Sequence, residues 1–287
     1  MKISVRAQNM PESPIRKLAK HADAAKRNGV HIYHLNIGQP DIKTPSCAMD
    51  ALQKFSQDVL EYSPSQGIKS LRTKMVGYYA EYGIDLSPDE IIITTGGSEA
   101  IMFAYMACLN PGDEIIVTDP SYANYMAFAI SCGAIVKSVK TDIEDGFRLP
   151  SIEEFEKQIT EKTRAILICN PNNPTGNVHS FDYIEHLLIE YPDTLFLIDE
   201  AYYEFSGISV KDLVLRYDNL LISRTMSKAF GLANFRIGYL MASRENIQFI
   251  NKIRNPKNVS SIAQVAACAA LEDTKYMWNY VNAVREG

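Results

Sequence analysis

Short, nearly continuous apolar runs at regular intervals are the feature that most constrains the fold of this chain. They are rich in β-branched residues and lie at Ile91–Thr94, Glu114–Thr118, Ala134–Val139, Ala165–Cys169, Leu195–Ile198, Leu220–Ile222 and Ile237–Met241. Because these runs are apolar on both faces, they indicate strands buried on both sides of a sheet. Segments of helical length separate most of them, at Ser98–Leu109, Ser151–Ile159 and Phe181–Glu190. This alternation predicts an α/β fold with a seven-stranded, mostly parallel sheet and flanking helices.

Helical patterns flank this region on both sides. Apolar residues recur at helical spacing over Ser13–Asn28, Cys47–Gln57 and Ile68–Tyr82, and Gly29 is a plausible stop for the first of these helices. Toward the carboxyl end, the residues from Ile262 to Val284 predict one long helix.

The charge and the cysteine content indicate which kinds of binding partner and which cellular compartment to expect. The 29 basic and 34 acidic residues give a net charge of −5, which argues against a nucleic-acid or anionic-membrane partner. The five cysteines are widely spaced and include no Cys-x-x-Cys pair, so neither a disulfide framework nor a metal site is expected. No secretory leader opens the sequence, and no apolar run approaches the roughly 20 residues of a membrane helix. These features together predict a cytoplasmic protein.

Polar residues follow five of the predicted strands at the point where each strand ends. They are Gly96-Gly97-Ser98-Glu99, Pro120-Ser121-Tyr122, Asn170-Pro171-Asn172-Asn173-Pro174-Thr175-Gly176, Asp199-Glu200-Ala201-Tyr202 and Arg224-Thr225-Met226-Ser227-Lys228. In open α/β sheets, ligands bind at the carboxyl ends of the strands. We therefore expect these side chains to meet at one edge and to form a ligand site.

Each of these signals also has a structural reading. Gly97 and Ser98 can cradle a phosphate at a helix start, or they can form only a tight turn with a capping serine. Asp199 can pair with a cationic ring nitrogen or with a structural cation. Lys228 lies among hydroxyl residues and can be a nucleophilic amine, although most lysines are solvated surface charges. Arg236 can grip a phosphate or form a surface ion pair.

The order of these motifs decides between the two readings. With Asn172-Asn173-Pro174-Thr175-Gly176 and Ser227-Lys228-Ala229-Phe230-Gly231 in this order, the chain resembles the class I/II aminotransferases of pyridoxal 5'-phosphate (PLP) fold type I. The resemblance implies that Lys228 holds PLP as a Schiff base and moves the substrate proton. It also implies that Asp199 holds the ring nitrogen protonated and that Tyr202 and Asn173 bond the ring oxygen. Tyr122 would stack on the ring. The phosphate would be held by Gly97, Ser98, Glu99, Thr225, Ser227 and Arg236.

The resemblance also implies an assembly and a domain plan. Tyr62 matches the family tyrosine that reaches the phosphate of the neighbouring subunit, which implies a homodimer with shared sites. Gly38 matches the loop that closes over the substrate, and Asn173 would also touch the substrate. We expect residues 1–45 to belong to the small-domain side, residues 46–265 to form the PLP-binding large domain, and residues 266–287 to begin a long interdomain helix.

The resemblance has a limit at the carboxyl end. Members of this family continue further, through most of a small domain that carries an arginine for the substrate α-carboxylate, and no arginine here matches that position. We therefore expect the small domain to be largely missing. The part from Ser13 to Val178 resembles aspartate-type enzymes, whereas the part from Asp199 to Leu232 resembles histidinol-phosphate aminotransferases. The function expected is transfer of an amino group from an amino acid to a 2-oxo acid or related carbonyl by a ping-pong mechanism. The alternatives are a PLP-dependent lyase or decarboxylase, and an inactive fragment that only dimerises.

Overall fold

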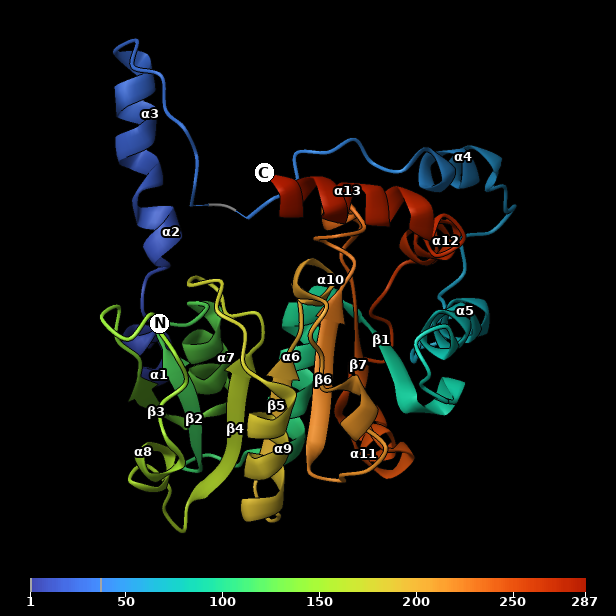
Figure 1. Ribbon diagram of the computed structural model, residues 1–287. Coiled ribbons are helices and arrows are strands. Elements are labelled where there is room, and N and C mark those ends of the chain that lie inside the picture. Colours follow the sequence, from blue (N-terminus) through green and yellow to red (C-terminus); the bar gives the residue numbers. More distant parts are fainter. Residues whose placement is uncertain (1, 37) are drawn as a thin grey trace.

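The computed structural model describes residues 2–36 and 38–287 as one seven-stranded sheet covered by helices (Figure 1). The strands are β1 (Ile91–Thr95), β2 (Glu114–Asp119), β3 (Ile135–Lys140), β4 (Thr163–Cys169), β5 (Leu195–Asp199), β6 (Leu220–Thr225) and β7 (Ile237–Met241). Their order across the sheet is β1-β7-β6-β5-β4-β2-β3. Only β7 runs antiparallel to its neighbours, β1 and β6, so the predicted mostly parallel sheet is confirmed.

Thirteen α-helices accompany the sheet in the described residues. They are α1 (Val5–Asn9), α2 (Pro14–Lys17), α3 (Ala19–Arg27), α4 (Ser46–Lys54), α5 (Lys69–Ala80), α6 (Gly96–Cys108), α7 (Asn124–Cys132), α8 (Ile152–Glu156), α9 (Phe181–Glu190), α10 (Tyr203–Ser206), α11 (Arg244–Ile253), α12 (Ser261–Ala270) and α13 (Thr274–Glu286). Among these residues, no helix combines the length and the apolar character that crossing a membrane requires.

Two apolar cores pack against opposite faces of the sheet because successive strand residues point to opposite sides. On β5, for example, Leu197 belongs to the core beneath α6, α7 and α11, whereas Ile198 belongs to the core beneath α5, α9 and α12. The central strands β6 and β7 are buried along their whole length. At the edge, β3 is different: Ile135 is 49% exposed, although its apolar sequence predicts a fully buried strand.

The carboxyl-terminal helical pattern is interrupted. The predicted single helix from Ile262 to Val284 is wrong, because α12 ends at Ala270 and α13 begins at Thr274. Asp273 lies between them, and its side chain accepts a hydrogen bond from the backbone N–H of Tyr276. Aspartate favours such a capping position over a helix interior because its short side chain competes with the helical hydrogen bonds.

The amino-terminal segment is divided: α1 lies beside α7, where Arg6 Nη1 donates to the Ser131 carbonyl at 2.8 Å, and the helices after it point outward. The predicted helix over residues 13–28 is found as α2 and α3, which project away from the body of the molecule in Figure 1. At the other end of the chain, α12 packs against α4 near α13 (Figure 1). The carboxyl ends of β4, β5 and β6 remain at one edge, where the predicted site residues follow them.

Candidate active site

A cavity of about 140 Å³ lies at this edge of the sheet and collects most of the predicted site residues. Those that line it are Gly97, Ser98, Tyr122, Asn173, Asp199, Tyr202, Thr225, Ser227, Lys228 and Arg236. They lie at or after the ends of five strands, except Arg236, which directly precedes β7. The prediction that these motifs meet at one edge is therefore confirmed.

The carboxylate of Asp199 lies at the end of β5 and is buried. Its Oδ2 atom accepts a hydrogen bond of 2.6 Å from the Tyr125 hydroxyl. Its Oδ1 atom accepts one of 3.0 Å from Ser223 Oγ and one of 3.2 Å from the backbone N–H of Ala201. Burial raises the pKa of Asp199 above its usual value, and these three hydrogen bonds act in the opposite direction because they favour the charged form.

Lys228 follows β6 and points across the cavity. Its Nζ donates a hydrogen bond of 2.5 Å to the carbonyl of Gly38 and lies 5.2 Å from the centre of the Tyr202 ring. Burial lowers the pKa of Lys228, and the nearby positive charge of Arg236 lowers it further. The Tyr202 hydroxyl accepts a hydrogen bond of 3.2 Å from Asn173, while burial raises the pKa of Tyr202 to about 12. The amine, the phenol and the amide thus share one wall of the cavity.

The opposite wall is suited to an anion. Gly97 and Ser98 lie in the first turn of α6, whose N–H groups and dipole attract negative charge. The hydroxyls of Thr225 and Ser227 are 2.9 Å apart, and Arg236 Nη1 donates to Ser227 Oγ at 3.4 Å. A side chain on Gly96 would place its Cβ 2.4 Å from Arg236 Nη2, so only glycine lets the guanidinium lie against the start of α6.

Three predicted site residues do not line this cavity. The carboxylate of Glu99 turns back to accept hydrogen bonds from the Thr95 backbone N–H at 2.7 Å and from Asn258 at 3.0 Å. Gly38 touches Lys228 only through its carbonyl oxygen. Tyr62 is 77% exposed and lines a separate pocket, where Lys257 Nζ lies 3.8 Å from the centre of its ring. Within one chain, the structure therefore does not bring Tyr62 to the cavity.

Sequence reasoning missed two direct partners of Asp199. Tyr122 lies in the loop before α7 and Tyr125 in the first turn of that helix, and the two rings pack edge to face with centroids 5.4 Å apart. No helical spacing links the two residues, because α7 begins only at Asn124, so the sequence gives no clear signal for Tyr125. Ser223 stands opposite Asp199 in the β5–β6 ladder, and this register is not visible in the sequence.

Comparisons with known proteins agree with this geometry. A model of the family described as aminotransferase class I and II matches residues 30–287. The chain is 42% identical over 206 residues to a dihydroxyacetone phosphate transaminase of Campylobacter jejuni, and that match covers 71% of this chain but 55% of the relative. It is 33% identical over 286 residues to the aspartate aminotransferase of Thermotoga maritima, covering 96% of this chain and 76% of the relative. A histidinol-phosphate aminotransferase of Carboxydothermus hydrogenoformans is 35% identical over 240 residues, which are 82% of this chain and 64% of the relative.

The same fold occurs in solved structures. A double mutant of the Thermus thermophilus aspartate aminotransferase superposes with a TM-score of 0.90 at 30% identity. That superposition covers 100% of this chain and 77% of the other, so this chain spans only part of the length of its relatives.

Proposed function

Because the chain belongs to the aminotransferase class I and II family, as its motifs predicted, we propose that it forms the PLP-binding part of an aminotransferase. The observation that carries the proposal is the single cavity in which Lys228, Asp199 and the Gly97–Arg236 anion site face one another. The reaction is transfer of an amino group from an amino acid to a 2-oxo acid or related carbonyl. The relatives described above are all aminotransferases or transaminases, which favours this chemistry over that of a lyase, a decarboxylase or an inactive fragment.

The residues of the cavity fit PLP in three places. The phosphate would be held by Ser98, Thr225, Ser227 and Arg236, together with backbone N–H groups at the start of α6 that include those of Gly97 and Glu99. Asp199 is a buried carboxylate suited to a protonated ring nitrogen, and Tyr202 with Asn173 is suited to the ring oxygen. Tyr122 would cover one ring face. When bound, the cofactor supplies an electron sink for the carbanion that forms at the substrate Cα.

The side chains of this chain supply the remaining chemistry. The lowered pKa of Lys228 increases the fraction of neutral amine, which is the form that can act as a nucleophile and accept a proton. The hydrogen bonds from Tyr125 and Ser223 favour the charged form of Asp199 against the effect of burial, and they fix its direction. Asn173 and Tyr202 also line an adjoining pocket of about 540 Å³, and we place the substrate on this side, next to Gly38.

The assembly and the domain plan remain part of the proposal. A homodimer would bring Tyr62 of one subunit to the phosphate of the other, and its exposure and distance from its own cavity support this role. Residues 1–45 would belong to the small-domain side, residues 46–265 to the cofactor domain, and residues 266–287 to the link between the domains. We place the protein in the cytoplasm on the basis of its sequence.

The test compares the parent chain with Lys228→Ala, and it uses Lys157→Ala as a control because Lys157 is an exposed lysine paired with Glu154. After PLP is added, the parent and the control should show the near-visible absorbance of a lysine-bound cofactor, and Lys228→Ala should not. Glutamate, aspartate or histidinol phosphate is then added, and the donor is the one that removes the band. Release of ammonia without an acceptor would instead identify a lyase. A folded parent chain with no band would refute the assignment.

A further inference from the structure

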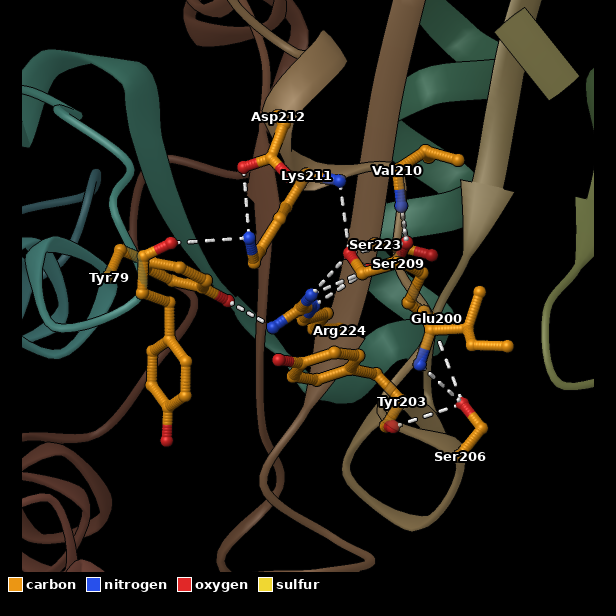
Figure 2. A network of polar contacts seen from close by, with 12 residues as sticks. Tyr79, Glu200, Tyr203, Ser206, Ser209, Val210, Lys211, Asp212, Ser223 and Arg224 are labelled. Carbon is orange, nitrogen blue, oxygen red and sulfur yellow. Dashed lines mark hydrogen bonds and ion pairs between the residues drawn. The ribbon is translucent and has the colours of Figure 1, made fainter. Parts of the chain in front are cut away.

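A buried ionic cluster joins Arg224 on β6 to Glu200, the residue after β5 (Figure 2). Because Ser223 bonds Asp199 at the cavity, its neighbour Arg224 on the strand points to the other face of the sheet. Arg224 and Glu200 form its centre and are 1% and 0% exposed. Arg224 Nε and Nη2 donate to Glu200 Oε2 at 2.9 and 2.6 Å, and Nη2 also donates to Ser209 Oγ at 2.8 Å. The hydroxyl of Tyr79 on α5 accepts from Nη1 at 3.0 Å, and the guanidinium carbon lies 3.8 Å from the centre of the Tyr203 ring.

A contribution to folding stability does not by itself explain why this ion pair is buried. Removing two charges from water costs about as much as their attraction returns, and apolar residues of similar size often replace a buried pair without loss of stability. The cluster is nevertheless well satisfied. Glu200 accepts further hydrogen bonds from Ser209 Oγ and from the backbone N–H of Val210 at 2.8 Å. Because the polar atoms of Glu200 and Arg224 have these hydrogen-bond partners, the pair fixes the positions of the two side chains more than it lowers the free energy of folding.

Three members of the cluster are each next in the chain to a site residue: Glu200 just after β5, Tyr203 at the start of α10 and Arg224 on β6. Glu200 follows Asp199, and Tyr203 follows Tyr202. Arg224 lies between Ser223, which donates a hydrogen bond to Asp199, and Thr225, which faces the anion site. On β6, Arg224 and its neighbours Ser223 and Thr225 point to opposite faces of the sheet. The backbone N–H of Glu200 donates to the Ser223 carbonyl at 2.9 Å, so a contact that fixes Glu200 and Arg224 also fixes the residues next to them in the chain.

We propose that the Arg224–Glu200 pair is a positioning element, which holds Asp199, Tyr202 and the Thr225–Lys228 segment in register for the cofactor from the opposite side of the sheet. The inference rests on the proposed function, since these residues are held in position to bind the cofactor. Its energetic effect would appear at the site, where a displacement of about 1 Å can cost about 100-fold in function.

The test replaces both partners, as Arg224→Met with Glu200→Met, so that neither member of the pair is left as a buried, unpaired charge and the net charge is unchanged. The matched control is Lys137→Met with Glu114→Met, an ion pair of 2.9 Å that joins β2 and β3 near their amino ends, away from the cavity. Three quantities are measured for each protein. They are the urea midpoint of unfolding, the dissociation constant for PLP, and the pKa of Lys228 in the cofactor-free protein. The pKa is obtained from the pH dependence of acetylation of Lys228, followed by mass spectrometry.

We expect the Arg224/Glu200 double variant to bind PLP at least about tenfold more weakly, and the pKa of Lys228 to rise toward its ordinary value as water enters the site. The control pair should change neither quantity, whatever its effect on the urea midpoint. A folded double variant with the parent's PLP affinity and Lys228 pKa would overturn the proposal, and so would equal losses in the control.

Two further results keep the test decisive. If the double variant does not fold, Arg224→Lys takes its place, because it keeps the charge but loses the planar fork. It should weaken PLP binding while leaving the urea midpoint near that of the parent, and unchanged binding would overturn the proposal. If the parent itself does not bind PLP, the proposed function fails, yet the comparison of Lys228 pKa values still decides whether the pair positions the site.

Discussion

At the scale of single residues, the state of Asp199 depends on its hydrogen-bond partners. Burial alone would favour the neutral acid, which cannot stabilise a protonated ring nitrogen. Tyr125 offsets this effect through a hydrogen bond of 2.6 Å to Oδ2. Tyr125 thereby favours the charged form of Asp199, the residue proposed to pair with the ring nitrogen.

Tyr125→Phe should therefore weaken PLP binding. Loss of a hydrogen bond to a charged group costs about 1.5–3 kcal/mol, which corresponds to at least about a tenfold loss of affinity. The pKa of Asp199 would rise further, so the loss should grow as the pH falls. PLP titrations from pH 5 to 8 would measure both effects. Tyr183→Phe is the control, because Tyr183 donates to the Pro150 carbonyl away from the cavity. A Tyr125→Phe protein that behaves like this control would contradict the expectation.

The residues that could be predicted from the sequence are those with unusual chemistry in a distinctive order. Lys228, Asp199, Asn173 and Arg236 lie in such motifs, and the structure brings them to one cavity. Ser223 could not be predicted, because its role follows from its pairing opposite Asp199 across two strands. Glu99 could be placed at the helix start, but not in its orientation toward Asn258.

At the scale of elements, the anion site depends on how closely β7 passes the start of α6. Gly238 on β7 lies against the Gly96–Gly97 peptide, where an added Cβ would be 2.3 Å from the Gly96 carbonyl carbon. The three atoms nearest to this added Cβ are the carbonyl carbon and oxygen of Gly96 and the nitrogen of Gly97, and as backbone atoms they cannot rotate away. The close packing thus requires glycine at Gly238 on the strand and at Gly96 on the helix, whereas an added Cβ at Gly97 would make only ordinary contacts of 3.8 and 3.9 Å.

Gly238→Ala should destabilise the protein by about 3 kcal/mol, the upper end of the usual cost of overpacking, and should abolish PLP binding. Gly77→Ala is the matched control, because Gly77 lies on the exposed side of α5 with no atom within 4 Å of an added Cβ. The Gly77→Ala change should stabilise the protein by about 0.5–1 kcal/mol, since alanine has a higher helix propensity than glycine. Urea unfolding would measure both, and equal effects of the two substitutions would rule out the steric explanation.

Strands were more predictable than helix ends. All seven predicted strands are present, because a buried parallel sheet imposes continuous apolar runs on the sequence. The break between α12 and α13 was missed because the apolar spacing continues across Leu271 and only the capping by Asp273 ends the pattern. Helix α11 was also missed, although Ser243 caps it through a hydrogen bond from the Asn246 backbone N–H.

At the scale of the whole molecule, Glu204 couples stability to pH. It is 2% exposed, and burial raises its pKa to about 7, while Arg224 acts in the opposite direction. A carboxyl whose pKa is higher in the folded state stabilises the fold fully below its unfolded pKa, near 4.5, and this contribution is lost as the pH rises through about 7.

Glu204→Gln should remove this dependence. Relative to the parent, the variant should gain up to about 3 kcal/mol between pH 4.5 and 8, measured by urea unfolding at several pH values. The quantity compared is the difference in unfolding free energy between the variant and the parent at each pH. This difference cancels the effect of buried His179, whose pKa is lowered to about 4 and whose contribution makes the fold more stable as the pH rises over a similar range. A constant difference across this range would show that Glu204 stays charged in the folded protein.

The proposed homodimer predicts that two inactive variants can complement each other when they are paired in one dimer. If Tyr62 serves the neighbouring site, Lys228→Ala and Tyr62→Phe remove different halves of each site. A mixed dimer then has one site without either residue and one site with both. Refolding the two variants together in equal amounts should restore full PLP affinity to about a quarter of all sites, by random pairing. Each variant refolded alone should have no fully functional site. If mixing restores none, then either Tyr62 acts within its own chain or the chains do not pair, and sedimentation of the parent would separate these two cases.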